Sequence, residues 1–268
     1  ILIPYLLKKT NGKEMVKKFL SKIGVHYIYR KYKLLTRYLQ FKREFEILRK
    51  TNGERFEVSK KYLYPCLDDN INRNSFDKHY VYHTAWAARK LKEINPKIHV
   101  DISSFIYFST IISAFIPIQY YEYRPVNIEL NNLETKHCDI TNLPFDDNSI
   151  VSLSCMHVVE HIGLGRYGDP LDPDGDLKAI NELKRVLAPN GYLIFVVPVG
   201  GKSIIMFNAH RIYTYEQVIS YFENFELIEF SLIPDQSEEG IILNANNDQA
   251  NRQIYGCGCF LFKKNREY

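Results

Sequence analysis

The sequence predicts an α/β domain built on a mainly parallel β-sheet with helices on both faces, preceded by a basic helical arm. From about residue 80 to residue 262, short runs that are apolar on both faces alternate with segments of helical periodicity. This alternation is typical of a parallel sheet that is covered on both sides. The 268 residues, 46% hydrophobic and 25% charged, have the composition of an ordinary globular protein with room for one large domain.

Charge is divided unequally along the chain. Residues 1–50 hold 14 Lys or Arg and 3 Glu, a net charge of +11, and the remainder carries a net charge of −7. We therefore separate an arm over residues 1–60 from an α/β domain over residues 61–268. Such a separation usually means that the basic part meets an anionic partner.

The arm is expected to be helical. Between Met15 and Lys50 there is no proline, only Gly24 interrupts the run, and apolar residues recur at helical spacing with Lys and Arg on the other faces. Packing on a protein partner, either the main domain or a second copy, is favoured over an anionic membrane surface, which a basic amphipathic helix can also bind. Nucleic acid is not expected, because no recognised binding module follows the arm.

The five cysteines indicate reduced thiols. Their number is odd, their spacing is not that of a disulfide framework, and we expect no signal peptide before them. The expected location is the cytoplasm, with the inner face of the membrane as a second location if the arm binds lipid. Cys257-Gly-Cys259 lies in an apolar run and is interpreted as a buried strand, since no second Cys or His pair accompanies it as a metal site would require.

The first half of the domain contains a helix at Ala85–Ile94, which ends before Asn95-Pro96 because the residue preceding proline resists helical geometry. The twenty uncharged residues Ile102–Tyr121 are long enough to span a membrane. They contain several Ser, Thr, Pro and Gln residues, so we assign them to a strand end, a buried helix and a second strand. The expected strands are 98–101, 117–122 and 136–139, with a helix at 105–115.

The second half begins with an unbroken apolar run at Ile150–Met156, which is expected to be a buried strand. A helix follows at Asp176–Leu187, and Pro189-Asn190-Gly191 turns the chain into a strand at Tyr192–Val197. A helix at Tyr215–Phe222 has Thr214 as its N-cap. The last two strands are expected at residues 225–233 and 255–262.

Ligands of a parallel sheet bind at the carboxyl ends of its strands. The residues that follow the expected strands there are Asp101–Ser104, Glu122–Arg124, Asp139-Ile140 and His157–Gly163.

The last of these segments contains three short motifs. His157, Glu160 and His161 match the H-x-x-E-H pattern of a zinc peptidase. Two histidines four residues apart share a face only in a helix, whereas Ile150–Met156 is expected to be a strand that ends at His157. A third protein ligand is not evident either, so no metal is expected.

The other two motifs fail on their context. Gly163-Leu-Gly-Arg-Tyr-Gly168 matches the dinucleotide fingerprint, but the Asp-Pro-Leu-Asp-Pro that follows cannot begin the required helix, so we expect a mobile loop over the site. Asp172, Asp174 and Asp176 resemble the start of a calcium loop, but Leu177 stands where that loop requires glycine. Asp174 or Asp176 is expected to cap the next helix.

Three longer segments carry a resemblance to a known family. Asp139–Ser149, Ser154–His161 and Glu182–Phe195, in this order and spacing, resemble a class I S-adenosylmethionine-dependent methyltransferase over residues 80–262. The resemblance implies a Rossmann-like, doubly wound sheet of seven strands. Asn208–Tyr213 is similar to a subgroup of methyltransferase-like proteins associated with bacterial surface-polysaccharide genes.

The resemblance implies S-adenosylmethionine as the cofactor. The residues that would hold it are Asp101, Ser103 and Ser104 after the first strand, Glu122 after the second, and Asp139 and Ile140 after the third. The family normally has Asp-x-Gly-x-Gly after its first strand, and here the chain has Asp101-Ile-Ser-Ser-Phe105. Glycine allows positive φ and close backbone approach that serine resists, so the sequence departs from the family at this loop.

Methyl transfer to an oxygen is an in-line displacement that needs a base for the hydroxyl proton. His157, His161 and His210 are the candidate bases, with Glu160 able to orient a histidine. The candidate contacts to a hydroxyl-rich acceptor are Tyr167, Asp169, Asp172 and Arg211. The expected function is O-methylation of a sugar or glycan precursor of a surface polysaccharide. The alternative, which the missing glycines favour, is a methyltransferase-fold protein without that activity that serves as a partner subunit in polysaccharide assembly.

Overall fold

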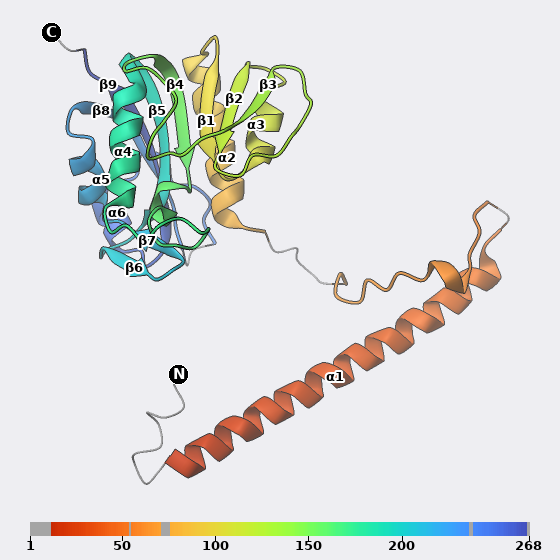
Figure 1. The fold of residues 1–268 in the computed structure, drawn as a ribbon. Coiled ribbons are helices and arrows are strands. Elements are labelled where there is room, and N and C mark those ends of the chain that lie inside the picture. The colour runs from red at the N-terminus through yellow and green to blue at the C-terminus, as the bar shows by residue number, and fades with distance from the viewer. Residues whose placement is uncertain (1–11, 54, 71–75, 236–237, 267–268) are drawn as a thin grey trace. The chain divides into compact units, whose positions relative to one another are not determined.

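The computed structural model describes residues 12–53, 55–70, 76–235 and 238–266, with side chains from residue 27 onward. The chain divides into two compact units, Ile1–Ser75 and Phe76–Tyr268, and each is described by itself (Figure 1). The division falls at Ser75, later in the chain than the boundary at residue 60 that the sequence predicts.

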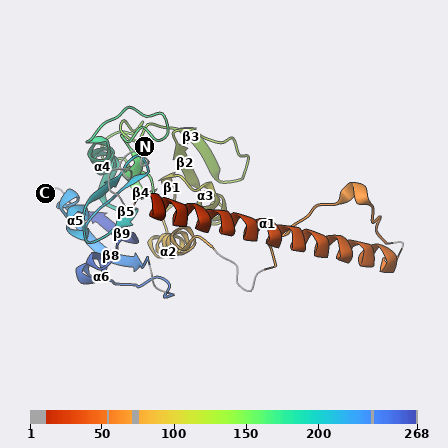
Figure 2. The same cartoon turned by 90° about the horizontal axis from the view of Figure 1, so that it is seen from below.

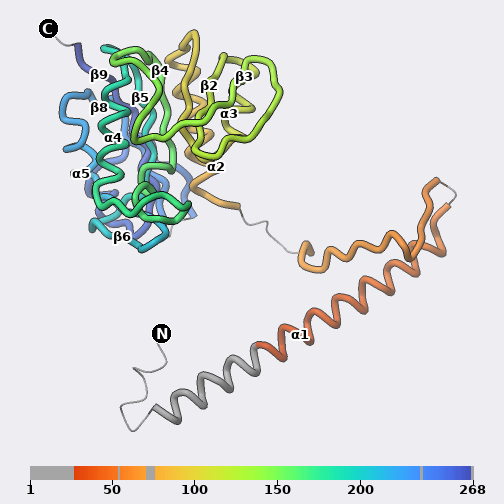
Figure 3. Tube along the Cα trace, in the orientation of Figure 1, coloured from red at the N-terminus to blue at the C-terminus, as the bar shows by residue number. Residues whose placement is uncertain are grey.

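The first unit contains one long helix, α1 (Gly12–Thr51), and a short 3-10 turn, η2 (Lys60–Tyr62). Figure 3 follows this segment as a tube from residue 27 onward. The helix continues through Gly24, as the spacing of residues 15–50 predicts; residues 1–11 of the predicted arm lie outside the described part. The side chains of Tyr27, Ile28 and Leu35 are each more than half exposed, and Lys31 lies 4.7 Å from the centre of the Tyr27 ring. Basic and apolar groups thus share the surface of this helix.

The second unit is built on a seven-stranded sheet in the order β3-β2-β1-β4-β5-β9-β8. Its strands are β1 (His99–Ser103), β2 (Ile118–Glu122), β3 (Leu133–His137), β4 (Ile150–Met156), β5 (Leu187–Val199), β8 (Phe225–Ile233) and β9 (Gly256–Lys264). The first five strands of this order pair in parallel, and β9 is antiparallel to both of its neighbours. The fold is therefore the Rossmann-like, mainly parallel α/β fold that the sequence predicts.

Helices cover both faces of the sheet. One face packs on α2 (Lys78–Ile94) and α3 (Ile106–Ile112), and the other packs on α4 (Gly175–Val186), α5 (Tyr215–Tyr221) and α6 (Asn247–Asn251). In Figure 2, α2 and α4 lie on opposite sides of the strands. Alternate residues of β5 enter the two cores, with Phe195 in one and Ile194 and Val196 in the other. This alternation explains why the central strands are apolar on both faces.

Most elements lie where the sequence places them. Strands β4 and β8 have the predicted bounds, and Thr214 caps α5 with a full capping box. The run Ile102–Tyr121 is the end of β1, α3 and most of β2, as predicted, and among the described residues no helix has the length and apolar character to cross a membrane.

Three differences matter for the site. Helix α2 begins at Lys78, seven residues before the predicted start, because the Asp77 side chain accepts a hydrogen bond from the Tyr80 N–H and caps it there. A two-stranded hairpin of β6 (Ile204–Met206) and β7 (His210–Ile212) was not predicted. Strand β5 begins at Leu187, which pairs with Ile150 before the predicted turn.

Candidate functional site

Five of the chain's eight histidines gather at the carboxyl edge of the parallel strands. This edge also receives the beginning of α2 and, because β9 runs antiparallel, the beginning of β9. Aromatic contacts connect these histidines, directly or through Tyr255. We call the set the histidine cluster: His79, His83, His157, His161 and His210.

His157 occupies the centre of the cluster, directly after β4. Its φ of 55° is left-handed, and its Nδ1 lies 2.7 Å from Glu160 Oε1 while its Nε2 lies 3.4 Å from Cys257 Sγ. A carboxylate can only accept a hydrogen bond, so Nδ1 carries a proton that it donates to Glu160, and Nε2 is the ring nitrogen that faces Cys257. Burial alone would raise the pKa of Glu160, but the charge of His157 and its hydrogen bond outweigh burial and lower it. Glu160 is therefore an ionised, buried carboxylate.

Of the other two histidines named from the sequence, His161 lies beside the same carboxylate and His210 lies next to His161. His161 Nδ1 donates to the Ala209 carbonyl at 2.7 Å, and its Nε2 is 3.8 Å from Glu160 Oε1. The His210 ring lies 6.4 Å from that of His161, and burial lowers the pKa of His210. The structure thus brings the three candidate bases together.

The zinc-peptidase reading of the H-x-x-E-H motif does not hold in the structure. Val159–His161 form a single 3-10 turn, η3, and His157 precedes it in a left-handed conformation. Glu160 Oε1 lies between the two histidine rings, hydrogen-bonded to His157 at 2.7 Å and 3.8 Å from His161 Nε2.

Four members of this site were not predicted as site residues, and one of them, Cys257, was interpreted only as part of a buried strand. His79 stacks on His157 with ring centres 5.8 Å apart, and His83 meets His157 edge-on at 5.0 Å. Tyr255 contacts His79 at 5.1 Å, and Cys257 is completely buried against His157. The available signal was the spacing of the two α2 histidines, four residues apart behind a capping Asp.

Burial keeps the two α2 histidines neutral. It lowers the pKa of His79 to about 4, with the positive charge of His157 acting in the same direction. Burial also lowers the pKa of His83 well below its ordinary value. At neutral pH both rings therefore offer an unprotonated nitrogen.

At the end of β1, Asp101 is enclosed by hydroxyl groups. Its carboxylate accepts hydrogen bonds from Ser103 at 2.6 Å and from Ser109 and Ser154 at 2.5 Å each. The side chain is fully buried, and burial raises its pKa despite these bonds. Asp101 therefore ties β1 to α3 and β4 and has no exposed surface with which to contact a ligand directly.

The loop that follows does not use the backbone conformation of glycine. Between Asp101 and Phe105 no residue has a positive φ. Ser103 is buried, whereas Ser104 is exposed, with its hydroxyl 3.4 Å from the His157 carbonyl. Of the two serines named from the sequence, only Ser104 is open to a ligand.

The ends of β2 and β3 present accessible carboxylates. Glu122 is half-buried and accepts a 3.3 Å hydrogen bond from the Arg124 N–H. Asp139 is exposed and accepts from the Thr141 N–H and hydroxyl at 2.8 and 2.7 Å, while Ile140 beside it is buried. These strand ends keep carboxylates at the positions that the sequence predicts for cofactor contacts.

Tyr167 lies between two guanidinium groups. Arg124, after β2, is 4.8 Å from the centre of its ring, and Arg166 is 5.1 Å away. Because β1 lies between β2 and β4 in the sheet, the contact of Arg124 with Tyr167 passes over the end of β1. The ring is 42% exposed, so this segment forms an accessible cover at the carboxyl edge.

The glycine pattern binds a carboxylate of the chain itself. Gly163, Gly165 and Gly168 all have positive φ, and the Asp169 carboxylate accepts from the N–H groups of Gly163 at 2.8 Å, Gly165 at 3.2 Å and Tyr167 at 3.2 Å. Burial would raise the pKa of Asp169, but these donors outweigh it and lower the pKa. Asp169 thus shapes the loop from within.

Arg211 and Asp172, which were predicted to contact the acceptor, already bond to other groups of the domain. Arg211 is 5% exposed and donates to the carbonyls of Ile162 at 2.6 Å and Pro173 at 3.1 Å. The Asp172 carboxylate accepts from Lys178 at 2.6 Å and from the Asp174 N–H at 3.0 Å. Both residues therefore stabilise the loop between η3 and α4 through these hydrogen bonds.

Asp174 stands at the N-cap of α4, but its side chain makes no capping hydrogen bond, so only its position agrees with the prediction. Asp176 lies in the first turn and accepts from the Tyr213 hydroxyl at 2.9 Å.

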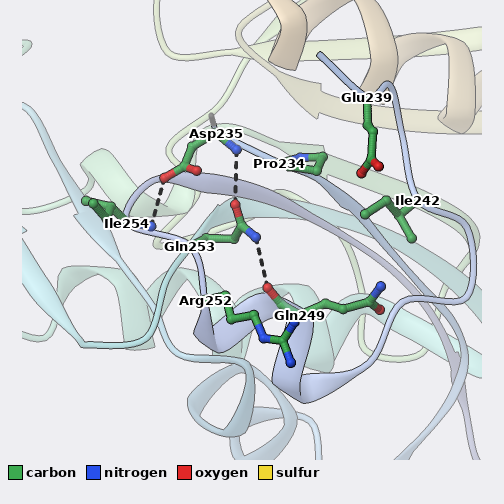
Figure 4. A pocket seen from close by; sticks show the side chains of 8 residues that line it. All are labelled: Pro234, Asp235, Glu239, Ile242, Gln249, Arg252, Gln253 and Ile254. Carbon is green, nitrogen blue, oxygen red and sulfur yellow. Dashed lines mark hydrogen bonds between the residues drawn. The ribbon is translucent and has the colours of Figure 1, made fainter. Parts of the chain in front are cut away.

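A separate groove of about 430 Å³ lies beside α6 (Figure 4). There the Asp235 carboxylate accepts from the Ile254 N–H at 2.8 Å, and Gln253 donates to the Gln249 carbonyl at 2.9 Å. None of the lining residues belongs to the histidine cluster or to the predicted site, and Asp235 also accepts from the N–H of Tyr255, which contacts the cluster, at 3.0 Å.

The chain is similar to a known protein in sequence, to solved structures in fold, and to the sequence model of one family. An uncharacterised protein of Methanocaldococcus jannaschii, MJ0638, is 36% identical over 94 residues, which cover 34% of this chain and only 36% of that protein. The YcgJ protein of Bacillus subtilis has a TM-score of 0.48 at 12% identity, covering 70% of this chain and 100% of that one.

A Burkholderia thailandensis 1,6-didemethyltoxoflavin-N1-methyltransferase with bound S-adenosylhomocysteine has a TM-score of 0.47 at 10% identity, covering 69% of this chain and 79% of that one. Both TM-scores are below 0.5, and the fold assignment rests on the strand order itself. The sequence model of the family described as "Caenorhabditis protein of unknown function, DUF268" matches residues 119–258, more than half of the chain, and the chain belongs to that family.

Proposed function

We propose that this protein is an S-adenosylmethionine-dependent methyltransferase that acts on a hydroxyl group. The observation that carries the proposal is the strand order β3-β2-β1-β4-β5-β9-β8 with an antiparallel β9, combined with carboxylates and histidines at the carboxyl ends of its strands. Open α/β sheets bind ligands at this edge. A mainly parallel, doubly wound sheet of seven strands is also what the methyltransferase resemblance of the three sequence segments implies.

The residues present fit the cofactor at two strand ends. Glu122 would accept from ribose hydroxyls, and Asp139 with Ile140 would contact the base, because the two carboxylates are accessible. Ser104 is the exposed group of the β1 loop, whereas Asp101 and its serine partners would act indirectly by holding that loop. When bound, S-adenosylmethionine supplies an electrophilic methyl group on a sulfonium sulfur.

Among the three histidines, His161 is best placed to receive the acceptor's proton. Its Nδ1–H is held by the Ala209 carbonyl, so its Nε2 keeps a lone pair, and the ring is half-buried. Ionised Glu160, 3.8 Å from that nitrogen, stabilises the ring once it is protonated. His157 is buried with both ring nitrogens engaged and therefore orients Glu160.

A hydroxyl-rich acceptor such as a sugar is supported by the aromatic and basic groups around Tyr167 at the carboxyl edge. Tyr167 offers an exposed aromatic ring, and Arg124 and Arg166 beside it are hydrogen-bond donors. The similarity of Asn208–Tyr213 to polysaccharide-associated proteins points to the same class, as a glycan precursor.

The proposal is tested by calorimetric titration with S-adenosylmethionine and S-adenosylhomocysteine. We expect the wild-type chain to bind both and Glu122→Gln to weaken binding about tenfold or more, since a hydrogen bond to a charged group is lost. Glu129→Gln, an exposed change after the same strand, should bind as the wild type does. Absence of wild-type binding at millimolar ligand would overturn the proposal.

A second function is favoured by the β1 loop. Its glycine-free sequence and the enclosure of Asp101 fit a methyltransferase-fold subunit that has kept the sheet and lost the cofactor, serving as a partner in polysaccharide assembly. The same titration separates the two, because this alternative predicts that neither compound binds to the folded protein.

A further inference from the structure

We propose that His79, His157 and Cys257 form a binding site for a borderline-soft divalent cation, of which zinc is the reference ion. The three residues come from α2, the end of β4 and the start of β9, so only the folded domain brings them together. Each offers one donor atom, and these atoms lie within 4.8 Å of one another. Imidazole nitrogen with thiolate sulfur is the donor set that such ions prefer.

The distances are close to those of a filled site. In tetrahedral zinc coordination, with bonds of about 2.0–2.3 Å, neighbouring ligand atoms are about 3.3–3.7 Å apart. His157 Nε2 and Cys257 Sγ are already 3.4 Å apart. The donor atom of His79 lies within 4.8 Å of the other two, and rotation of this half-buried side chain on the first turn of α2 can bring it closer.

The surroundings of His157 are those of a metal ligand. Metal-binding histidines commonly donate their other ring N–H to a carboxylate, which fixes the tautomer and raises the basicity of the ligating nitrogen. His157 makes this contact with Glu160 at 2.7 Å, and Glu160 is 1% exposed. The lone pair of Nε2 is thereby directed to Cys257.

An independent observation points to a missing partner at the same place. Among the described residues, the buried side-chain atoms that lack a hydrogen-bond partner are His83 Nε2, Glu160 Oε2 and His210 Nε2. All three belong to residues that contact His157 or its neighbours, and His83 and Glu160 are almost completely buried. Buried polar atoms are rarely left unpaired, so His83 Nε2, on the ring that meets His157 edge-on, is the atom of this set that a water on the bound ion would partner.

Protonation is compatible with binding. At neutral pH the His79 ring is unprotonated because burial lowers its pKa to about 4. The thiol of Cys257 has a raised pKa from burial and must lose its proton as the metal–sulfur bond forms. Two neutral imidazoles, one thiolate and a divalent ion leave a net charge of +1 at the centre, beside the negative charge of Glu160.

Three protein ligands leave a fourth position open, which is characteristic of catalytic zinc sites. An ion there would lower the pKa of a bound water or acceptor hydroxyl. The site stands independently of the proposed methyl transfer, since ion binding needs neither cofactor nor acceptor.

The rival interpretation is a Cys-His-Glu nucleophile in Cys257, His157 and Glu160, because thiol, base and orienting carboxylate are in hydrogen-bonding order. The thiol of Cys257 has no exposed surface, and burial raises its pKa, both of which oppose attack on a substrate. A nucleophile would need only Cys257, His157 and Glu160. His79, which lies beside them, has a role only in a metal site, as the third ligand.

The test uses the full chain, stripped with chelator and titrated with Zn²⁺, with bound metal measured by mass spectrometry. Co²⁺ serves as a spectroscopic probe of thiolate coordination. We expect about one ion per chain and a cobalt–thiolate charge-transfer band. His79→Gln and Cys257→Ser should weaken binding about a hundredfold, and Glu160→Gln about ten- to a hundredfold.

Two matched variants serve as controls. His137→Gln removes an exposed histidine and Cys155→Ser a buried thiol of the opposite core, and both should bind metal as the wild type does. His79→Gln changes a half-buried residue, so it remains informative if Cys257→Ser does not fold.

Wild-type protein that takes up no zinc from micromolar free ion would overturn the proposal, as would unchanged affinity in His79→Gln. Rapid alkylation of Cys257 without metal uptake would assign the cluster to the nucleophile. Binding of S-adenosylhomocysteine to the stripped protein is measured in parallel, so the two proposals can fail separately.

Discussion

At the residue scale, Asp101 is a buried side chain that joins several elements near the carboxyl edge. Three serine hydroxyls donate to it, and Ser154 also meets His99 Nε2 at 2.8 Å, so one network joins β1 to β4. We expect Asp101→Asn to lower the free energy of unfolding by about 1–3 kcal/mol, because asparagine offers one acceptor oxygen to buried donors that now share two. Urea denaturation measures this, with exposed Asp146→Asn as the control.

If Asp101 contacted the cofactor directly, the same variant would lose S-adenosylhomocysteine binding while keeping its stability. That pattern would contradict the structural role assigned here.

His99 gives the domain a pH dependence. Burial lowers its pKa to about 3 in the folded state, against 6.5 ordinarily, so between these values the unfolded chain binds the proton more readily. Stability is therefore fully present above pH 6.5 and falls as the pH is lowered. The urea midpoint should decrease from pH 7 to pH 5, before most carboxyl groups are protonated.

His79, with a pKa of about 4, contributes in the same direction. A His99→Asn variant should show a shallower dependence over this range. An equal slope in the variant would mean that His99 is not the responsible group.

At the scale of elements, the loop from η3 to α4 is shaped by its glycines. A Cβ on Gly163 would lie 2.1 Å from the Asp172 carbonyl oxygen, whereas one on Gly168 would meet no atom within 4 Å, although both glycines have positive φ. Gly168→Ala should cost about 1 kcal/mol of stability from backbone conformation alone. Gly163→Ala should cost about 2–4 kcal/mol, because the loop must also move.

Thermal denaturation and limited proteolysis of the loop compare the two variants. Equal losses would show that the close approach to Asp172 does not constrain this segment.

Sequence patterns predict the bounds of some elements of this domain and miss others. Strands β4 and β8 were predicted at their bounds because their apolar runs end at polar residues or turns. The start of α2 was missed because its first two turns are rich in polar and aromatic residues, and Asp77 sets it by a capping bond. The β6–β7 hairpin was missed because it pairs only three residues on each side.

The candidate site was predictable only in part for a related reason. Strand order places Glu122, Asp139 and His157 at one edge, so residues that follow strands could be named from the sequence. His79 and Cys257 reach that edge from a preceding helix and an antiparallel last strand, and no local pattern reports that convergence. The enclosure of Asp101 depends on Ser109 and Ser154, which tertiary packing supplies.

At the scale of the whole molecule, two units of different character share one chain. The second unit has its own two-sided core, so a fragment of residues 76–268 should fold alone. The first exposes apolar side chains such as Ile28 and Leu39 on a basic helix, a surface suited to a protein partner or an anionic membrane.

We expect the full chain to bind anionic vesicles or to self-associate, and the fragment to do neither. Vesicle sedimentation and analytical ultracentrifugation distinguish the two partners. A fragment that bound vesicles as the full chain does would show that the arm is not the binding element.

Amide chemical-shift mapping with S-adenosylhomocysteine decides whether the carboxyl edge of the sheet binds S-adenosylmethionine. We expect shifts at Ser104, at Glu122–Arg124, at Asp139-Ile140 and at His157–His161, the segments that meet at this edge. Shifts confined to the groove beside α6, or none at millimolar ligand, would contradict it.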